Sequence, residues 1–207
     1  MRAILVANPK GGCGKTTLAT NLAGYLARQN QRVVMWDLDQ QKSSLSWLAL
    51  RSPELPTIAR LGLERDDVPQ GVTKNEWLVL DSPSGIHGKN LSHALKLAHK
   101  VIVPVQPSVF DMVTTRDFID RLMEEKTIQK HKTFIGMIGM RVDPRTRAAS
   151  TLEQFLMQYD LPILTYLRDT MVYVNSAFNG KSIFDLPFHQ AERDLKQWQP
   201  LTEWLKA

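Results

Sequence analysis

The chain has 207 residues, with 26 Lys and Arg against 21 Asp and Glu, a formal net charge of +5 and one cysteine, Cys13. This length fits one α/β domain over residues 1–207 and leaves no room for a second sizeable domain. A single cysteine excludes an internal disulfide and any multi-cysteine metal centre within the chain, and no apolar run approaches membrane-spanning length.

The basic excess is spread over both halves of the sequence, so it permits a nucleic-acid partner without indicating one. The first expected strand begins at residue 2. We therefore expect no signal peptide and a cytoplasmic protein.

A glycine-rich segment follows that first strand. Residues 2–7 form a short apolar run typical of a buried strand, residues 8–17 read Asn-Pro-Lys-Gly-Gly-Cys-Gly-Lys-Thr-Thr, and residues 16–28 have helical spacing. Strand, loop and helix in this order are the context of a phosphate-binding loop. The ordinary pattern G-x-x-x-x-G-K-[ST] would need glycine where this chain has Pro9. The segment instead matches K-G-G-x-G-K-T-T, with an additional lysine, Lys10, at its front.

The residue types of this loop suit the polyphosphate of ATP together with Mg²⁺. We expect the three glycines to adopt positive φ and to let backbone N–H groups surround the phosphates. Lys15 would place a positive charge on the β- and γ-phosphates, and Thr16 would offer its hydroxyl to Mg²⁺. The predicted nucleotide-binding residues of the loop are Gly11, Gly12, Cys13, Gly14, Lys15, Thr16 and Thr17.

Two later strands end in carboxylates. Residues 32–37 end at Asp37, with Asp39 two positions further on, and residues 76–81 end at Asp81. Ligands of open α/β sheets bind at the carboxyl ends of the strands. One of the first two aspartates could orient an attacking water while the other holds the water shell of the metal, and Asp81 has the position of an acid that binds Mg²⁺ through water. Residues 82–85, Ser-Pro-Ser-Gly, would face the γ-phosphate.

The remaining elements continue the alternation of strands and helices. Residues 52–71 are less regular and could hold a short extra strand and a loop. We expect further strands at 100–105 and 133–141, and helices at 41–50, 93–98, 111–129 and 145–159. A last helix has a stripe of apolar residues, and Pro200 would break or kink it; the stripe is Leu195, Trp198, Leu201, Trp204 and Leu205. The alternation predicts a single-domain phosphate-loop NTPase with a mostly parallel twisted sheet and helices on both faces.

Together these segments resemble the ParA/MinD family of deviant-Walker ATPases, most closely the small ParA partition proteins that lack an N-terminal DNA-binding domain. The resemblance covers most of the chain and is carried by residues 10–17, 37–40, 81–83 and 103–108. The last of these segments contains Pro107 and is similar to the proline-containing nucleotide loop of small ParA proteins.

The resemblance implies a role for each catalytic residue. Lys10 would reach across a nucleotide-sandwich homodimer to the phosphates held by the partner subunit, so that a complete site exists only in the ATP-bound dimer. Lys15 would hold the phosphates of its own subunit, Asp39 would position the attacking water, and Asp37 would lie near the metal. The family usually has proline after the second aspartate, where this chain has Gln40.

The resemblance also implies partners. Arg141 follows the fifth strand, where family members place polar groups near adenine, although Met140-Arg141 departs from the commonest pattern. Residues 168–170 and 180–182 resemble a late loop in which an arginine contributes to non-specific DNA binding. The candidate DNA contacts are therefore Arg168, Lys181, Arg193 and Lys196. An adaptor protein bound to the cargo would stimulate hydrolysis and release the dimer from the nucleoid; the cargo could be a plasmid, a chromosome region or a protein assembly.

Two other functions fit the same loop. A MinD-like membrane regulator would need the apolar stripe of the last helix free to enter lipid, but such stripes usually face the interior of a domain, so we expect this one to pack on the core. An ATP-dependent ligase of cobyrinate or biotin synthesis would need residues for a small carboxylate substrate, and none are evident. A nitrogenase-type iron protein would need ligating cysteines outside the loop.

Overall fold

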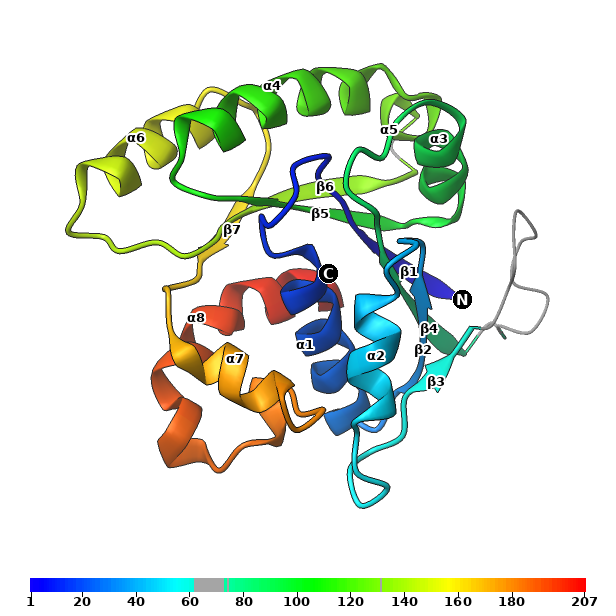
Figure 1. The fold of residues 1–207 in the computed structure, drawn as a ribbon. Coiled ribbons are helices and arrows are strands. Elements are labelled where there is room, and N and C mark those ends of the chain that lie inside the picture. The colour runs from blue at the N-terminus through cyan, green and yellow to red at the C-terminus, as the bar shows by residue number, and fades with distance from the viewer. Residues whose placement is uncertain (62–72, 74, 131) are drawn as a thin grey trace.

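A seven-stranded parallel sheet forms the centre of the protein (Figure 1). The computed structural model describes residues 1–61, 73, 75–130 and 132–207. Every strand pair is parallel, in the order β3-β2-β4-β1-β5-β6-β7. The strands are β1 (Arg2–Val6), β2 (Arg32–Asp37), β3 (Ala59–Arg60), β4 (Glu76–Asp81), β5 (Lys100–Val105), β6 (Phe134–Gly139) and β7 (Ile163–Tyr166).

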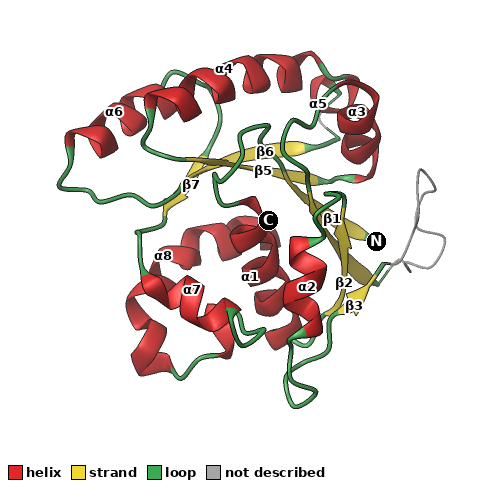
Figure 2. Cartoon of the chain, viewed as in Figure 1, coloured by secondary structure: helices red, strands yellow, loops and turns green. Residues whose placement is uncertain are grey.

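Helices cover both faces of this sheet (Figures 1 and 2). One layer contains α3 (Gly88–Leu97), α4 (Val109–Glu124), α5 (Lys126–Gln129) and α6 (Arg147–Leu156). The opposite layer contains α1 (Lys15–Arg28), α2 (Ser43–Ala49), α7 (Met171–Ala177), the 3₁₀ turn η1 (Ile183–Asp185) and α8 (Phe188–Lys206). The expected fold class, a parallel sheet between two helical layers, is confirmed.

The strands read as continuous apolar runs because both of their faces are buried. Along β1, Ala3 and Leu5 pack into the core beneath α3, α4 and α6, whereas Ile4 and Val6 pack into the core shared with α1 and α8. The two cores lie on opposite faces of the sheet, so the central strands are packed from both sides. Their carboxyl ends, and the loops that follow them, are consequently held in one place.

The structure confirms the five strands expected from the sequence and adds detail between them. The short extra strand expected within residues 52–71 is β3, and residues 62–71 of that segment lie outside the described residues. The edge strand β7 and helix α7 were not predicted. The expected helix over residues 111–129 is interrupted at Glu125, which has the extended backbone angles φ −70° and ψ 132°, so α4 and α5 are separate helices.

The last helix packs on the core, as expected. Trp198 and Leu201 are fully buried and Leu205 nearly so, and the Trp198 indole donates a hydrogen bond to the Tyr173 hydroxyl at 2.9 Å. Of the two outcomes predicted for Pro200, a break or a kink, the break was wrong, because α8 continues through Pro200. Proline has no backbone N–H, so the carbonyl of Lys196, one helical turn earlier, has no helical donor. Both residues are exposed, so water can bind that carbonyl. Among the described residues, no helix is both long and apolar enough to cross a membrane.

This packing predicts a large loss of stability for Trp198→Ala. Removing a fully buried indole should lower the free energy of unfolding by about 3–5 kcal/mol, measured by denaturant titration. Phe188→Ala, on the same helix but 62% exposed, is the matched control and should change stability by less than about 0.5 kcal/mol. Equal effects for the two variants would mean that α8 does not pack on the core through Trp198.

Candidate functional site

The glycine-rich loop joins β1 to α1 at the carboxyl edge of the sheet. Gly12 and Gly14 have φ of +77° and +99°, the left-handed region that glycine adopts without strain. A side chain at Gly14 would also meet Met140, because its Cβ atom would lie 2.7 Å from the Met140 Cε atom. Gly11 does not have positive φ, so the prediction was wrong for that glycine; a Cβ atom there would lie 3.6 Å from the Ser84 hydroxyl oxygen.

Helix α1 presents an uncapped N-terminus to this loop. Its N-cap residue is Gly14, which has no capping side chain, and the first turn contains no acidic residue. The free N–H groups of the first turn and the helix dipole therefore favour an anion there. Thr16 and Thr17 are partly exposed at the same end of the helix. The Lys15 side chain is buried, and its ammonium donates to the Lys10 carbonyl oxygen at 2.9 Å.

Asn8 fixes the front of the loop, and sequence reasoning did not single it out. Its fully buried amide donates at 2.8 Å both to the Pro104 carbonyl at the end of β5 and to the Thr115 hydroxyl of α4. Its oxygen accepts from the Lys10 N–H at 2.9 Å. Asn8 therefore sets the position of Lys10 relative to β5 and α4. The sequence did contain a signal for Asn8: it is a polar residue directly after an apolar strand and just before Pro9 and Lys10.

The two aspartates after β2 have different surroundings. Asp37 is buried and both its oxygens accept hydrogen bonds: Oδ1 from the Asp39 N–H at 2.9 Å, and Oδ2 from the N–H and hydroxyl of Ser44 at 2.9 and 2.7 Å. Asp39 is only half-buried, and its Oδ1 accepts from the Gln41 N–H at 3.0 Å. Asp37 thus holds the loop and the start of α2 in place, while the second oxygen of Asp39 has no hydrogen-bond partner among the residues described.

Asp81 is the unsatisfied carboxylate of the site. It is 2% exposed, and its Oδ1 has no hydrogen-bond partner among the described residues; the hydroxyl of the adjacent Ser82 is also buried and unpaired. Burial raises the pKa of Asp81 to about 7, with Thr16 and Lys15 opposing the rise and Asp37 and Asp39 adding to it. A buried carboxylate with an unpaired oxygen is stabilised by a cation, so Asp81, with the hydroxyl of Thr16 beside it, fits a hard divalent metal such as Mg²⁺.

A cavity of about 440 Å³ adjoins the loop. It is lined by Gly14, Thr16 and Thr17 on one side and by Met140, Arg141 and Asp169 on another. Arg141, predicted near a base, therefore does reach this cavity, and its guanidinium lies 4.0 Å from the Asp169 carboxylate. Pro107 lies one residue after Gln106, whose amide donates to the Gly12 carbonyl at 2.8 Å, so the proline-containing turn contacts the glycine-rich loop.

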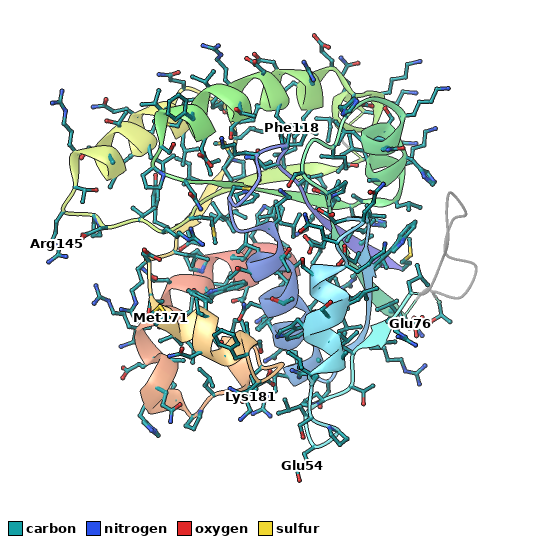
Figure 3. The ribbon with its side chains drawn as sticks, in the orientation of Figure 1. Glu54, Glu76, Phe118, Arg145, Met171 and Lys181 are labelled. Atoms are coloured by element: carbon teal, nitrogen blue, oxygen red, sulfur yellow. The ribbon has the colours of Figure 1, made fainter. Side chains whose placement is uncertain are left out.

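The four basic residues predicted to contact DNA are not equivalent. Arg168 is bound through two hydrogen bonds, of 2.7 and 2.9 Å, to the fully buried Asp194 of α8. Lys196 pairs with Glu192 one helical turn away at 2.7 Å, and Arg193 is exposed. Lys181 lies after α7. Figure 3 labels Met171, where α7 begins, and Lys181, in the turn that follows it. The Lys181 carbonyl accepts a hydrogen bond from the Trp47 indole of α2 at 3.3 Å.

Comparisons with known proteins agree with this arrangement. Residues 4–183 match the family model described as the CobQ/CobB/MinD/ParA nucleotide binding domain. The chain is 26% identical over 189 residues to the maintenance of carboxysome distribution protein A of Halothiobacillus neapolitanus, covering 88% of this chain and 87% of the relative. It is 28% identical over 186 residues to the chromosome-partitioning ATPase Soj of Thermus thermophilus, covering 74% of each.

The fold is shared with solved structures. A plasmid partition protein of Borrelia burgdorferi, crystallised with AMPPNP, superposes with a TM-score of 0.74 over 98% of both chains, at 18% sequence identity.

The unsatisfied carboxylate predicts an unusual pH dependence of stability without metal. Because the pKa of Asp81 is raised to about 7 in the folded protein, the folded state retains a proton that the unfolded chain releases, and stability falls as the pH rises from about 4 to 7. In buffer containing a chelator, Asp81→Asn should be more stable than the parent by on the order of 2–4 kcal/mol at pH 8 and by little at pH 4.5. Denaturant titration at both pH values measures this, with Asp120→Asn as an exposed control; the same difference at both pH values would contradict it.

Proposed function

The chain belongs to the CobQ/CobB/MinD/ParA nucleotide-binding family, and we propose that it is a partition or positioning ATPase built as one domain of residues 1–207. In this proposal ATP and Mg²⁺ bind at the glycine-rich loop and drive homodimerisation in the cytoplasm. The dimer binds nucleoid DNA without sequence preference, and an adaptor protein on the cargo stimulates hydrolysis and releases it. The observation that carries the proposal is a glycine-rich loop with two lysines, Lys10 and Lys15, at the same sheet edge as Asp39 and Asp81.

The donors of the loop support polyphosphate binding. The Lys15 ammonium is held by the Lys10 carbonyl, a neutral acceptor that it can exchange for a phosphate oxygen. The uncapped N-terminus of α1 and the positive φ of Gly12 and Gly14 leave backbone N–H groups for the remaining oxygens. A structural neighbour binds AMPPNP, which is consistent with a nucleoside triphosphate as the ligand.

Thr16 and Asp81 would hold Mg²⁺, with Asp37 near it. When bound, the metal would supply positive charge that offsets the charge of the phosphates and of the buried Asp81. Asp37 has both oxygens committed to backbone and hydroxyl donors, so we assign it to positioning the loop that contains Asp39. The half-buried Asp39 then has an oxygen available to orient the attacking water.

Lys10 is the residue that links nucleotide binding to dimerisation in this proposal. Its backbone is fixed by Asn8, while its ammonium has no partner among the described residues. A cation supplied by the other subunit would neutralise charge as the γ-phosphoryl group is transferred. ATP would therefore act as the assembly switch. The base would occupy the 440 Å³ cavity, with Arg141 on its wall and Pro107 beside the loop.

We assign DNA binding to Lys181, Arg193 and Lys196, with Arg168 in a supporting position. Arg168 is the only one of the four whose charge is opposed by a fully buried carboxylate, Asp194. Removing Arg168 would leave that carboxylate unpaired, at a cost of about 3–5 kcal/mol in stability, so loss of DNA binding in such a variant would not identify a DNA contact. Lys181 is the informative residue, because its side chain has no ion-pair partner in the described part of the chain.

The two lysines of the loop should give different phenotypes. Lys15→Ala should weaken ATP binding on the order of 10- to 100-fold, because it removes a charge-assisted contact to the phosphates. Lys10→Ala should bind ATP nearly as the parent does but should fail to dimerise when ATP is added. Nucleotide titration and the molar mass in solution, with and without ATP, measure these two effects. An ATP-dependent dimer of Lys10→Ala would contradict the role of Lys10 across the interface.

The partner class can be tested by retention on random-sequence DNA and on anionic vesicles over a salt series. With ATP, we expect retention on DNA that decreases steeply as salt increases, and Lys181→Ala should weaken binding and reduce the slope of log K against log salt by about 1. Lys89→Ala, an exposed lysine of α3, is the matched control and should behave as the parent does. Retention on vesicles without retention on DNA would instead support the membrane alternative.

A further inference from the structure

A buried carboxylate on α4 has no part in the proposed mechanism. Asp111 lies in the first turn of α4, is 6% exposed, and its Oδ1 has no hydrogen-bond partner among the described residues. An unpaired buried carboxylate is costly, so it needs a nearby positive charge or a functional reason.

The face of α4 that carries Asp111 packs against the base of the glycine-rich loop. Thr115 lies one helical turn further along the same face, and its hydroxyl accepts the 2.8 Å hydrogen bond from Asn8. Just before α4, the Gln106 amide donates to the Gly12 carbonyl. Asp111 is close enough to act on the loop electrostatically: burial is the main cause of the raised pKa of Cys13, and the Asp111 charge adds to it.

The loop itself contains two cations and no acidic residue. The buried Lys15 ammonium is bonded to a neutral carbonyl, and the Lys10 ammonium has no partner in the part of the chain that the structure describes. Because Asp111 and Lys15 are both buried, water screens their charges little, so a carboxylate on α4 lowers the energy of the loop cations when no anion is bound. The same carboxylate raises the energy of a polyphosphate placed in the loop.

We propose that Asp111 is the internal counter-charge of the glycine-rich loop, which compensates the loop lysines in the nucleotide-free protein and limits how tightly a nucleotide polyphosphate is held. Asp111 acts through Lys10 and Lys15, so it is a positioning residue and not a catalytic one. Its effect would favour departure of the nucleoside diphosphate after hydrolysis. This inference rests on the proposed function, because it requires nucleotide phosphates at the loop.

The test is whether removal of the Asp111 charge raises or lowers the affinity for nucleotides. Asp111→Asn keeps the shape of the side chain and removes its charge, so it should bind ATP and ADP about three- to tenfold more tightly than the parent and should leave AMP affinity nearly unchanged. Asp120→Asn removes the same charge from an exposed position of α4 and is the matched control, which should bind all three nucleotides as the parent does. Isothermal titration with Mg²⁺ and each nucleotide measures the constants.

A purely structural role for Asp111 gives the opposite result, because a damaged loop would bind ATP less tightly. Thr115→Val, which removes the acceptor for Asn8 without changing charge, should show that weakening. If folded Asp111→Asn binds ATP and ADP no more tightly than the parent, the counter-charge role is overturned. The proposed function stays intact in that case, provided that the parent protein binds ATP. No ATP binding by the parent would overturn the proposed function itself. If Asp111→Asn does not fold, the neutral variant Asp111→Ser takes its place and should also bind ATP and ADP more tightly than the parent.

Discussion

The burial of charge at one edge of the sheet is the constraint on which the site depends. Strands β1, β2 and β4 lie side by side, and their carboxyl ends deliver the glycine-rich loop, Asp37 and Asp81 to that edge. A buried charge is stable only when it is paired or hydrogen-bonded. Each charge here meets this requirement differently: Asp37 through local donors, Lys15 through a loop carbonyl, and Asp81 incompletely, with one oxygen left unpaired.

These differences separate supporting residues from those that meet a ligand. Asp37 and Asn8 use their polar atoms within the protein and hold loops in place. From Asp37 the contacts continue along α2, where Trp47 binds the Lys181 carbonyl; just after the helix, Arg51 forms a buried ion pair with Asp185 at 2.8 Å. The carboxylate loop and the turn that carries Lys181 are thus joined through one short helix. Asp81, Asp39 and the ammonium of Lys10 retain polar atoms that have no partner in the described part of the chain.

Much of the fold could be predicted because the central strands are apolar on both faces. β1, β2, β4, β5 and β6 stand out as short apolar runs, and two of them end in aspartate. β7 was missed because it has four residues, pairs on one side only, and has partly exposed ends at Ile163 and Tyr166. Helix α7, with seven residues, was also missed, and the break at Glu125 has no proline or glycine to signal it.

The sequence by itself determined the chemistry of the loop and the order of the elements, because glycine, lysine and aspartate at fixed spacing restrict the backbone and the charge locally. Only the tertiary structure decided which of these charges are already satisfied. Asp37 and Asp81 both end apolar strands, yet both oxygens of Asp37 accept hydrogen bonds from Ser44 and the backbone, whereas Asp81 Oδ1 has no partner among the described residues. Arg168 resembles a DNA contact in sequence but is paired with Asp194, 26 residues away. The reason is that a charge is satisfied by whatever lies within about 3 Å, and packing brings together residues that are far apart in the chain.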